Sequence, residues 1–178
     1  MRNRTLDALK VPMWFLLAAA WLSACSPGNP PTPAALDIVV DTTVVPHVAE
    51  LPPFEDGGAP RPVAAIVGAT GKPAAFVANE LWLQTDDAAA LDAFLARWHG
   101  TVVSSLSSAD HGLADLPSQY LVRVDASSAD SATLVADLRK LDPTSQGDYR
   151  VSSEAGLNLL AAVGHEAAAG APVGLNWV

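Results

Sequence analysis

Four side chains of the kinds used in nucleophilic catalysis lie close together in the sequence: Ser107, Asp110, His111 and Asp115. Hydrolysis by a serine requires its hydroxyl, an imidazole base and an orienting carboxylate to converge within hydrogen-bond reach. Neighbours on one short loop point apart more often than they converge. We therefore expect a solvated loop here rather than a catalytic centre, and we predict that the chain is not an enzyme.

The histidines do not predict a metal site. His47, His99, His111 and His165 are far apart in the sequence and lack the short spacings of zinc ligands. We expect no bound metal ion.

A segment with closely spaced glycines, Val63 to Val77, contains Gly68-Ala69-Thr70-Gly71 and then Lys72. A phosphate-binding Walker loop needs Ser or Thr after its lysine, but Pro73 stands there. A dinucleotide-binding loop needs a helix after its glycines, and the next clear element is a strand. The segment predicts a β-hairpin with glycines at its turn, and no cofactor or small-molecule substrate is expected.

The charge balance excludes another class of partner. The chain has 10 Lys and Arg residues against 19 Asp and Glu residues, which gives a net charge of −9. A protein that binds nucleic acid needs a basic stripe to displace the counterions of the phosphates. The few basic residues are scattered, so we expect no nucleic-acid binding.

Residues 1–24 have the composition of a secretory signal peptide, with three basic residues before an apolar run from Val11 to Leu22. The run is too short for a spanning helix, which needs about 20 apolar residues. It closes on Leu22-Ser23-Ala24-Cys25, which resembles a bacterial lipobox. The resemblance implies cleavage before Cys25 and lipid on its sulfur and new amino group. An ordinary secretory signal or an uncleaved anchor is the alternative.

Cys25 is the only cysteine of the chain, so no disulfide framework is predicted. Two or more acyl chains on Cys25 would attach the protein stably to a membrane. We therefore expect a cell-envelope protein. By resemblance to lipoproteins of cells with two membranes, Ser26 favours the outer membrane over the inner one.

The segment 25–62 is rich in proline, because residues 26 to 62 hold nine of the fourteen prolines of the chain. Such a composition is typical of a linker, and we expect it to be disordered. One stretch within it, Asp37 to Val45, is rich in β-branched residues and could instead add a strand to a sheet edge.

Within residues 63–153, the hairpin is followed by two copies of the same order of elements, strand, helix and strand. The six elements are, in chain order, Asn79 to Gln84, Thr85 to Gly100, Thr101 to Leu106, Gln119 to Asp125, Ser127 to Pro143 and Tyr149 to Ser153. Asp86 or Thr85 is the expected cap of the first helix, and Ser127 with Asp130 that of the second. The order predicts an α+β fold, a ferredoxin-like βαββαβ sandwich with a four-stranded antiparallel sheet and two helices on one face.

The other face of this sheet would be open. Leu81 and Leu83 would face the helices, so the alternating positions would face outward, among them Glu80, Trp82, Leu121 and Arg123. An aromatic anchor beside an arginine is typical of a protein-binding surface. The alternative is that the hairpin or the C-terminal tail covers Trp82.

Residues 154–178 predict a helix, capped by Ser152 or Ser153, and an extended apolar tail. The tail ends in Leu175, Asn176, Trp177 and Val178, whereas chain ends are normally polar unless something holds them. We therefore expect the tail to pack against a partner or against the domain.

Taken together, the run from Val77 to Leu106, the strand Gln119 to Asp125 and the strand Tyr149 to Ser153 resemble a known family. It is the amino-terminal prodomain of bacterial subtilisin-like serine proteases, including the fervidolysin-like kind. The resemblance covers residues 63–178. It implies an intramolecular chaperone and inhibitor whose open sheet face docks on surface helices of the protease. It also implies that the segment after the last strand, with Leu175, Trp177 and Val178, lies in the substrate cleft.

The chain departs from this family in two ways. The family chain normally continues into a catalytic domain, which residues 1–178 do not contain; the expected C-terminal helix also interrupts the route from the last strand to the cleft. Our leading hypothesis is a lipid-anchored, non-catalytic module that inhibits or helps to fold a subtilisin-like protease. The alternatives are the pro-region fragment of a truncated or split protease and a structural envelope lipoprotein.

Overall fold

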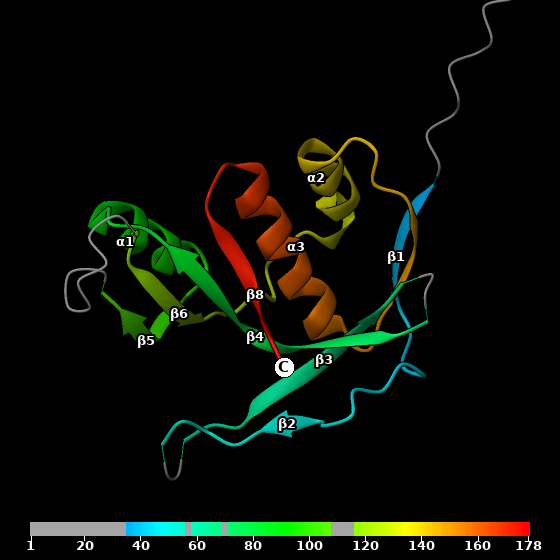
Figure 1. Ribbon diagram of the computed structural model, residues 1–178, viewed down its shortest axis with the longest axis horizontal. Helices are drawn as coiled ribbons and strands as arrows, with labels where there is room; N and C mark the ends of the chain where they lie inside the picture. The colour runs from blue at the N-terminus through cyan, green and yellow to red at the C-terminus, as the bar shows by residue number, and fades with distance from the viewer. Residues whose placement is uncertain (1–34, 56–57, 69–70, 108–115) are drawn as a thin grey trace, which may run out of the picture. The chain divides into compact units, whose positions relative to one another are not determined.

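The computed structural model describes residues 35–55, 58–68, 71–107 and 116–178. Its elements are, in chain order, β1 (Leu36–Val40), β2 (Glu50–Leu51), β3 (Arg61–Val67), β4 (Pro73–Gln84), α1 (Ala88–Arg97), β5 (Thr101–Leu106), β6 (Gln119–Arg123), α2 (Leu134–Leu141), β7 (Gly147–Val151), α3 (Glu154–Ala168) and β8 (Val173–Trp177) (Figure 1). The predicted hairpin is confirmed, because β3 and β4 pair antiparallel from Val63 opposite Val77 to Val67 opposite Pro73.

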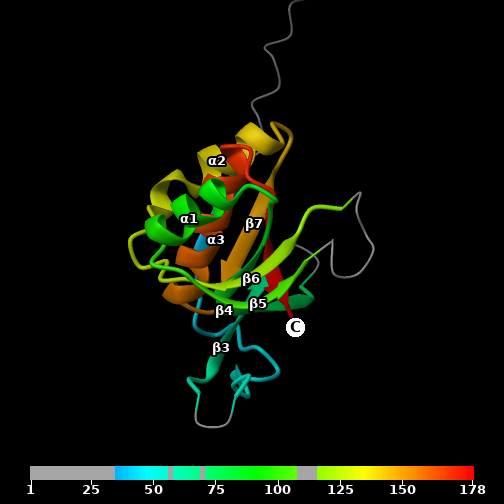
Figure 2. The same ribbon diagram turned by 90° about the vertical axis from the view of Figure 1, so that its left-hand side faces the viewer.

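The strands form one eight-stranded, mostly antiparallel sheet in the order β1-β7-β3-β4-β6-β5, with β2 beside β3 and β8 beside β4. Among the described strands, only β1 and β7 pair in parallel. Helices α1, α2 and α3 all lie on one side of the sheet (Figure 2). The predicted α+β class is confirmed, but the sheet has twice the expected number of strands.

The long strand β4 joins the two halves of this sheet. Its first half pairs with β3 and its second half with β6, while Leu81 pairs with Val122 on one side and with Leu175 of β8 on the other. The register shifts between Phe76 and Leu81, as at a β-bulge. As a result, the core side chains of β4 change from even to odd positions, Phe76 and Ala78 and then Leu81 and Leu83.

One prediction about the neighbours of β4 is wrong. The strand predicted at Tyr149 to Ser153, observed as β7, pairs with β1 and β3 rather than with β4. The place beside β4 is taken by the apolar tail, which forms β8 and so packs against the domain, one of the two outcomes that we expected for it. Sequence periodicity identifies a strand but not its partner.

The described part of the predicted linker is also ordered, against our expectation of disorder. All five residues of β1 pair with β7, and β2 pairs with β3. Leu36 and Val44 are buried. The β-branched stretch from Asp37 therefore does add a strand at the sheet edge, as the alternative interpretation proposed.

Side-chain caps explain where α1 and α3 begin. α1 is capped by Asp87, whose Oδ1 accepts hydrogen bonds from the backbone N–H groups of Ala89 and Ala90. The predicted cap Asp86 is instead bound to the backbone and hydroxyl of Ser118. The predicted cap of α3 is confirmed, because the Ser153 hydroxyl accepts a hydrogen bond from the N–H of Gly156.

α3 lies close to the sheet because of a glycine. A Cβ at position 156 would lie 2.7 Å from the Cβ of Ala64 on β3 and 3.0 Å from Cγ1 of Val151 on β7. Real carbon atoms do not approach so closely, so Gly156 sets the distance between the helix and the sheet. Glycine weakens a helix, but at this position only a residue without a Cβ permits the close contact with the sheet.

We predict that Gly156→Ala destabilises the fold, although alanine favours a helix by about 1 kcal/mol. The methyl group would force α3 away from Ala64, and overpacking of this kind costs about 1–3 kcal/mol. Urea unfolding followed by tryptophan fluorescence measures the change. Gly174→Ala is the matched control, since a Cβ there meets no atom within 4 Å; equal stability of the two variants would contradict the packing argument.

Candidate protein-binding face

The side of the sheet opposite the helices is organised around one buried carboxylate. Glu80 on β4 is 0% exposed. The guanidinium of Arg61 on β3 donates from Nε to both carboxylate oxygens at 3.0 and 3.1 Å and from Nη2 to Oε2 at 2.8 Å. A paired, multiply hydrogen-bonded carboxylate of this kind is stable in the interior, whereas an isolated one is not.

Two further donors complete the cluster. Arg123 on β6 donates from Nη2 to Oε1 at 3.2 Å, and the side-chain amide of Asn176 on β8 donates to Oε2 at 3.0 Å. The guanidinium of Arg61 also lies 3.9 Å from the centre of the Phe54 ring, in cation–π geometry. We call Arg61, Glu80, Arg123 and Asn176 the Glu80 cluster. It connects β3, β4, β6 and β8 through side chains.

The protonation of Glu80 follows from these contacts. Burial alone would raise the pKa of its carboxyl, but the hydrogen bonds from Arg61, Arg123 and Asn176 and the charge of Arg61 outweigh it, so that the pKa lies below its ordinary value. Glu80 is therefore ionised at neutral pH. With two guanidinium groups around one carboxylate, the cluster has a net positive charge on an acidic protein.

Three of the predicted contact residues are brought together here. Trp82 lies directly opposite Leu121, and Glu80 opposite Arg123. Trp82 is half-buried, and the side chain of Arg123 is 30% exposed. Leu121 lies on this face as expected, but it is 4% exposed, so it supports the surface rather than forming it. The accessible residues of the face are thus Trp82 and Arg123.

The surface is open beside Trp82 but covered beside Arg123. Gly174 of β8 lies opposite Trp82 in the sheet, and a Cβ there would meet no atom within 4 Å, so the face is open beside Trp82. A cavity of about 240 Å³ adjoins Arg123, lined by Pro53, Phe54 and β5 among others. The arm of chain before β3 therefore covers the face next to Arg123.

The remaining predicted contact residues lie elsewhere. Leu175 and Trp177 pack on the helix-bearing side of the sheet, where Leu175 contacts the core and the Trp177 ring lies edge-on to Phe76 at 5.8 Å. Val178 donates its N–H to the carbonyl of Ala75. The structure thus separates Leu175 and Trp177 from Trp82, Leu121 and Arg123, which lie on the other side of the sheet.

Other predicted residues fall outside this face. Cys25, Asp110, His111 and Asp115 lie outside the described residues, while Ser107 is described and half-buried. Within the described ranges, no three His, Cys, Asp or Glu residues are grouped as metal ligands would be. The helices of that same part of the chain include none with the length and apolar character needed to cross a membrane.

Sequence reasoning missed the Glu80 cluster. It placed Glu80 on the outward face but assigned it no partner, and it assigned Arg61 to the linker. The available signal was a single acidic residue within the otherwise uncharged strand from Pro73 to Gln84. Such a residue in a central strand needs a basic partner, but its identity depends on the pairing of β3 with β4 and of β6 with β4.

Comparison with known proteins gives no relative for this chain. No protein-family model, curated protein or solved structure matches it.

We predict that Glu80→Gln destabilises the fold by about 3 kcal/mol, because breaking a buried ion pair leaves guanidinium groups without their counter-charge. Urea unfolding gives the free energy. Glu50→Gln on the exposed strand β2 is the control and should change it by less than about 0.5 kcal/mol. Similar losses in both variants would mean that the cluster contributes little.

The parent chain and Glu80→Gln also give a prediction about the pH dependence of stability. Because the pKa of Glu80 is lower in the folded state than its ordinary value of 4.5, its contribution to stability is present above that value and is lost as the pH falls below it. Other acidic groups titrate in this range too, so the informative quantity is the difference in unfolding free energy between the parent chain and Glu80→Gln. This difference should shrink from pH 6 towards pH 3. A pH-independent difference would contradict the assignment.

Proposed function

We propose that this chain is a non-catalytic binding module, anchored in the cell envelope by lipid on Cys25, that associates with a subtilisin-like serine protease as its inhibitor or folding chaperone. The observation that carries the proposal is the outward face of β4 and β6. There Trp82 stands half-exposed beside an arginine that an ion cluster holds in place. Aromatic and arginine side chains are the commonest anchors of protein interfaces.

The pairing of the strands supports the family resemblance in a form that differs from our first expectation. We infer that β4, α1, β5, β6, α3 and β8 form a ferredoxin-like unit. Its strands lie in the order β8-β4-β6-β5, so that the last strand of the unit is beside the first. In this interpretation α2 and β7 are an insertion that extends the sheet towards β1.

The geometry favours the open sheet face, rather than the C-terminal tail, as the docking surface. β8 is paired along β4, and its last residues are held by Phe76 and Ala75. To reach a protease cleft, they would have to leave the sheet. The proposal therefore relies on Trp82 and Arg123 and assigns no cleft-binding role to Leu175, Trp177 or Val178.

Gly174 provides a way to test the face without disturbing the fold. We predict that Gly174→Arg, which places a long side chain in the open space beside Trp82, weakens binding to a subtilisin-type protease at least about tenfold, a loss of about 1.4 kcal/mol. Ala96→Arg is the matched control, since it adds the same side chain at an exposed position of α1 on the helix-bearing side.

The measurement uses the full chain in detergent solution at micromolar concentration. It follows inhibition of peptide hydrolysis, recovery of activity when denatured protease is refolded with the chain, and complex formation by native mass spectrometry. If the parent chain shows none of these effects, the proposed function is wrong. If both arginine variants bind as well as the parent, the docking surface lies elsewhere.

A further inference from the structure

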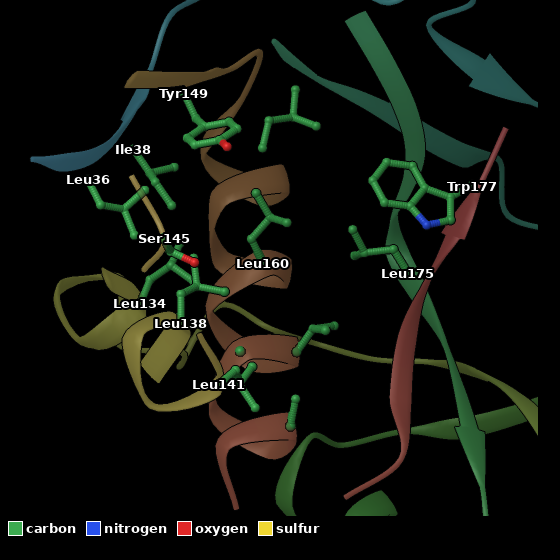
Figure 3. Close-up of a pocket in the computed structure, with 14 residues that line it drawn as sticks. Leu36, Ile38, Leu134, Leu138, Leu141, Ser145, Tyr149, Leu160, Leu175 and Trp177 are labelled. Atoms are coloured by element: carbon green, nitrogen blue, oxygen red, sulfur yellow. The ribbon is translucent and has the colours of Figure 1, made fainter. Parts of the chain in front are cut away.

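The helix-bearing side of the sheet contains an apolar groove of about 360 Å³, separate from the face around Trp82. In Figure 3, α3 runs along its middle, with α2 and β1 on one side and β8 on the other. Leu160 and Val163 of α3 line the groove. Leu138 and Leu141 of α2 belong to one wall, and Leu175 and Trp177 of β8 to the other.

The groove exists because α3 has more apolar surface than the sheet covers. Leu159 and Ala162 are buried against the sheet, whereas Leu160 and Val163 are only half-buried. At the rim, Leu141 is 51% and Trp177 is 56% exposed. A contiguous apolar depression marks a binding site more often than scattered exposed residues do. Its volume lies within the range of small-ligand sites, about 300–1,000 Å³.

The chemistry of the lining restricts what can bind. Among the described residues, no Lys, Arg, His, Asp or Glu side chain lines the groove, and its polar groups are the hydroxyls of Ser145 and Tyr149 and the indole N–H of Trp177. An ionised group inside it would have no counter-charge, and the chain as a whole carries a charge of −9, which disfavours anions. The part of the ligand that enters must therefore be uncharged.

Size distinguishes between two uncharged occupants. An α-helix of a partner is about 10–12 Å across with its side chains, so most of it would remain outside a groove of this volume. A hydrocarbon chain is thin enough to enter over its whole length. The hydroxyl of Tyr149 lines the groove (Figure 3), where it could donate a hydrogen bond to an ester carbonyl. The hydroxyl of Ser145 is already bound to the carboxylate of Asp142.

We propose that the groove binds one long acyl chain of an ester-linked lipid without net charge, with the ester at Tyr149. This inference does not depend on protease binding, because it concerns the opposite side of the sheet. It gives the protein a second, lipid-binding surface within the folded domain.

The test is photo-crosslinking of the full chain with 1-monopalmitoylglycerol that carries a diazirine in its acyl chain, used below its aggregation concentration. Tandem mass spectrometry locates the label. We expect saturable labelling of the peptides that contain α2, α3 and β8, and competition by unlabelled 1-monopalmitoylglycerol. Labelling confined to the apolar residues 11–22, or labelling that never saturates, would overturn the proposal.

Two alanine variants make the test specific. Ala167 is half-buried and lines the groove, so Ala167→Leu fills it while keeping a good helix former. This variant should need at least tenfold more probe for half-maximal labelling. Ala96→Leu adds the same side chain on α1, outside the groove, and should label like the parent. Equal labelling of both variants would show that the groove is not the site.

If circular dichroism shows that Ala167→Leu is unfolded, Leu141→Ser at the exposed rim replaces it. We again expect weaker labelling, and unchanged labelling would contradict the proposal.

Competitors test the nature of the occupant. Palmitate, which carries a charged head, should compete at least tenfold less well than the glycerol ester, and equal competition would overturn the requirement for an uncharged head. Displacement of the label by an amphipathic helical peptide but not by unlabelled ester would assign the groove to a protein partner instead.

Discussion

A fully buried carboxylate constrains most of this structure. Removing Glu80 from water is unfavourable unless its charge and its lone pairs are all compensated, and the compensating donors come from three other strands. A shift of one residue in the pairing of β6 or β8 would turn Arg123 or Asn176 to the other side of the sheet. Glu80 therefore selects one register for strands that are far apart in the sequence.

The same cluster determines the properties of the candidate binding face. A long arginine side chain normally loses rotamer freedom when it binds a partner, and this loss opposes binding. Arg123 is already held by Glu80, and Trp82 is half-buried between paired strands, so little order remains to be imposed. The face is preorganised. It is also narrower than an uncovered sheet, because Phe54 and Arg61 hold the arm before β3 against it.

Local pattern was enough to predict the elements from Val63 onward but not their pairing. The hairpin, the strands at Trp82 and Leu121 and the cap of α3 at Ser153 follow from alternation and turn chemistry. The partner of each strand is a tertiary property, and for this reason β7 was given the wrong place and the tail was not assigned to the sheet. The strand β1 was underestimated because proline content was weighed above the β-branched residues from Asp37. The Glu80 cluster depended on these pairings and could not be predicted without them.

The two sides of the sheet differ in their chemistry. Around Trp82 the surface combines an indole with a net positive ion cluster, which suits a polar protein surface that carries acidic groups. Across the sheet, the described residues that line the groove beside α3 include no charged side chain, which suits a hydrocarbon. β8 contributes to both, because Asn176 points to Glu80 while Leu175 and Trp177 line the groove. The alternation of side chains along β8 therefore lets a single strand complete an ion cluster on one face and an apolar wall on the other.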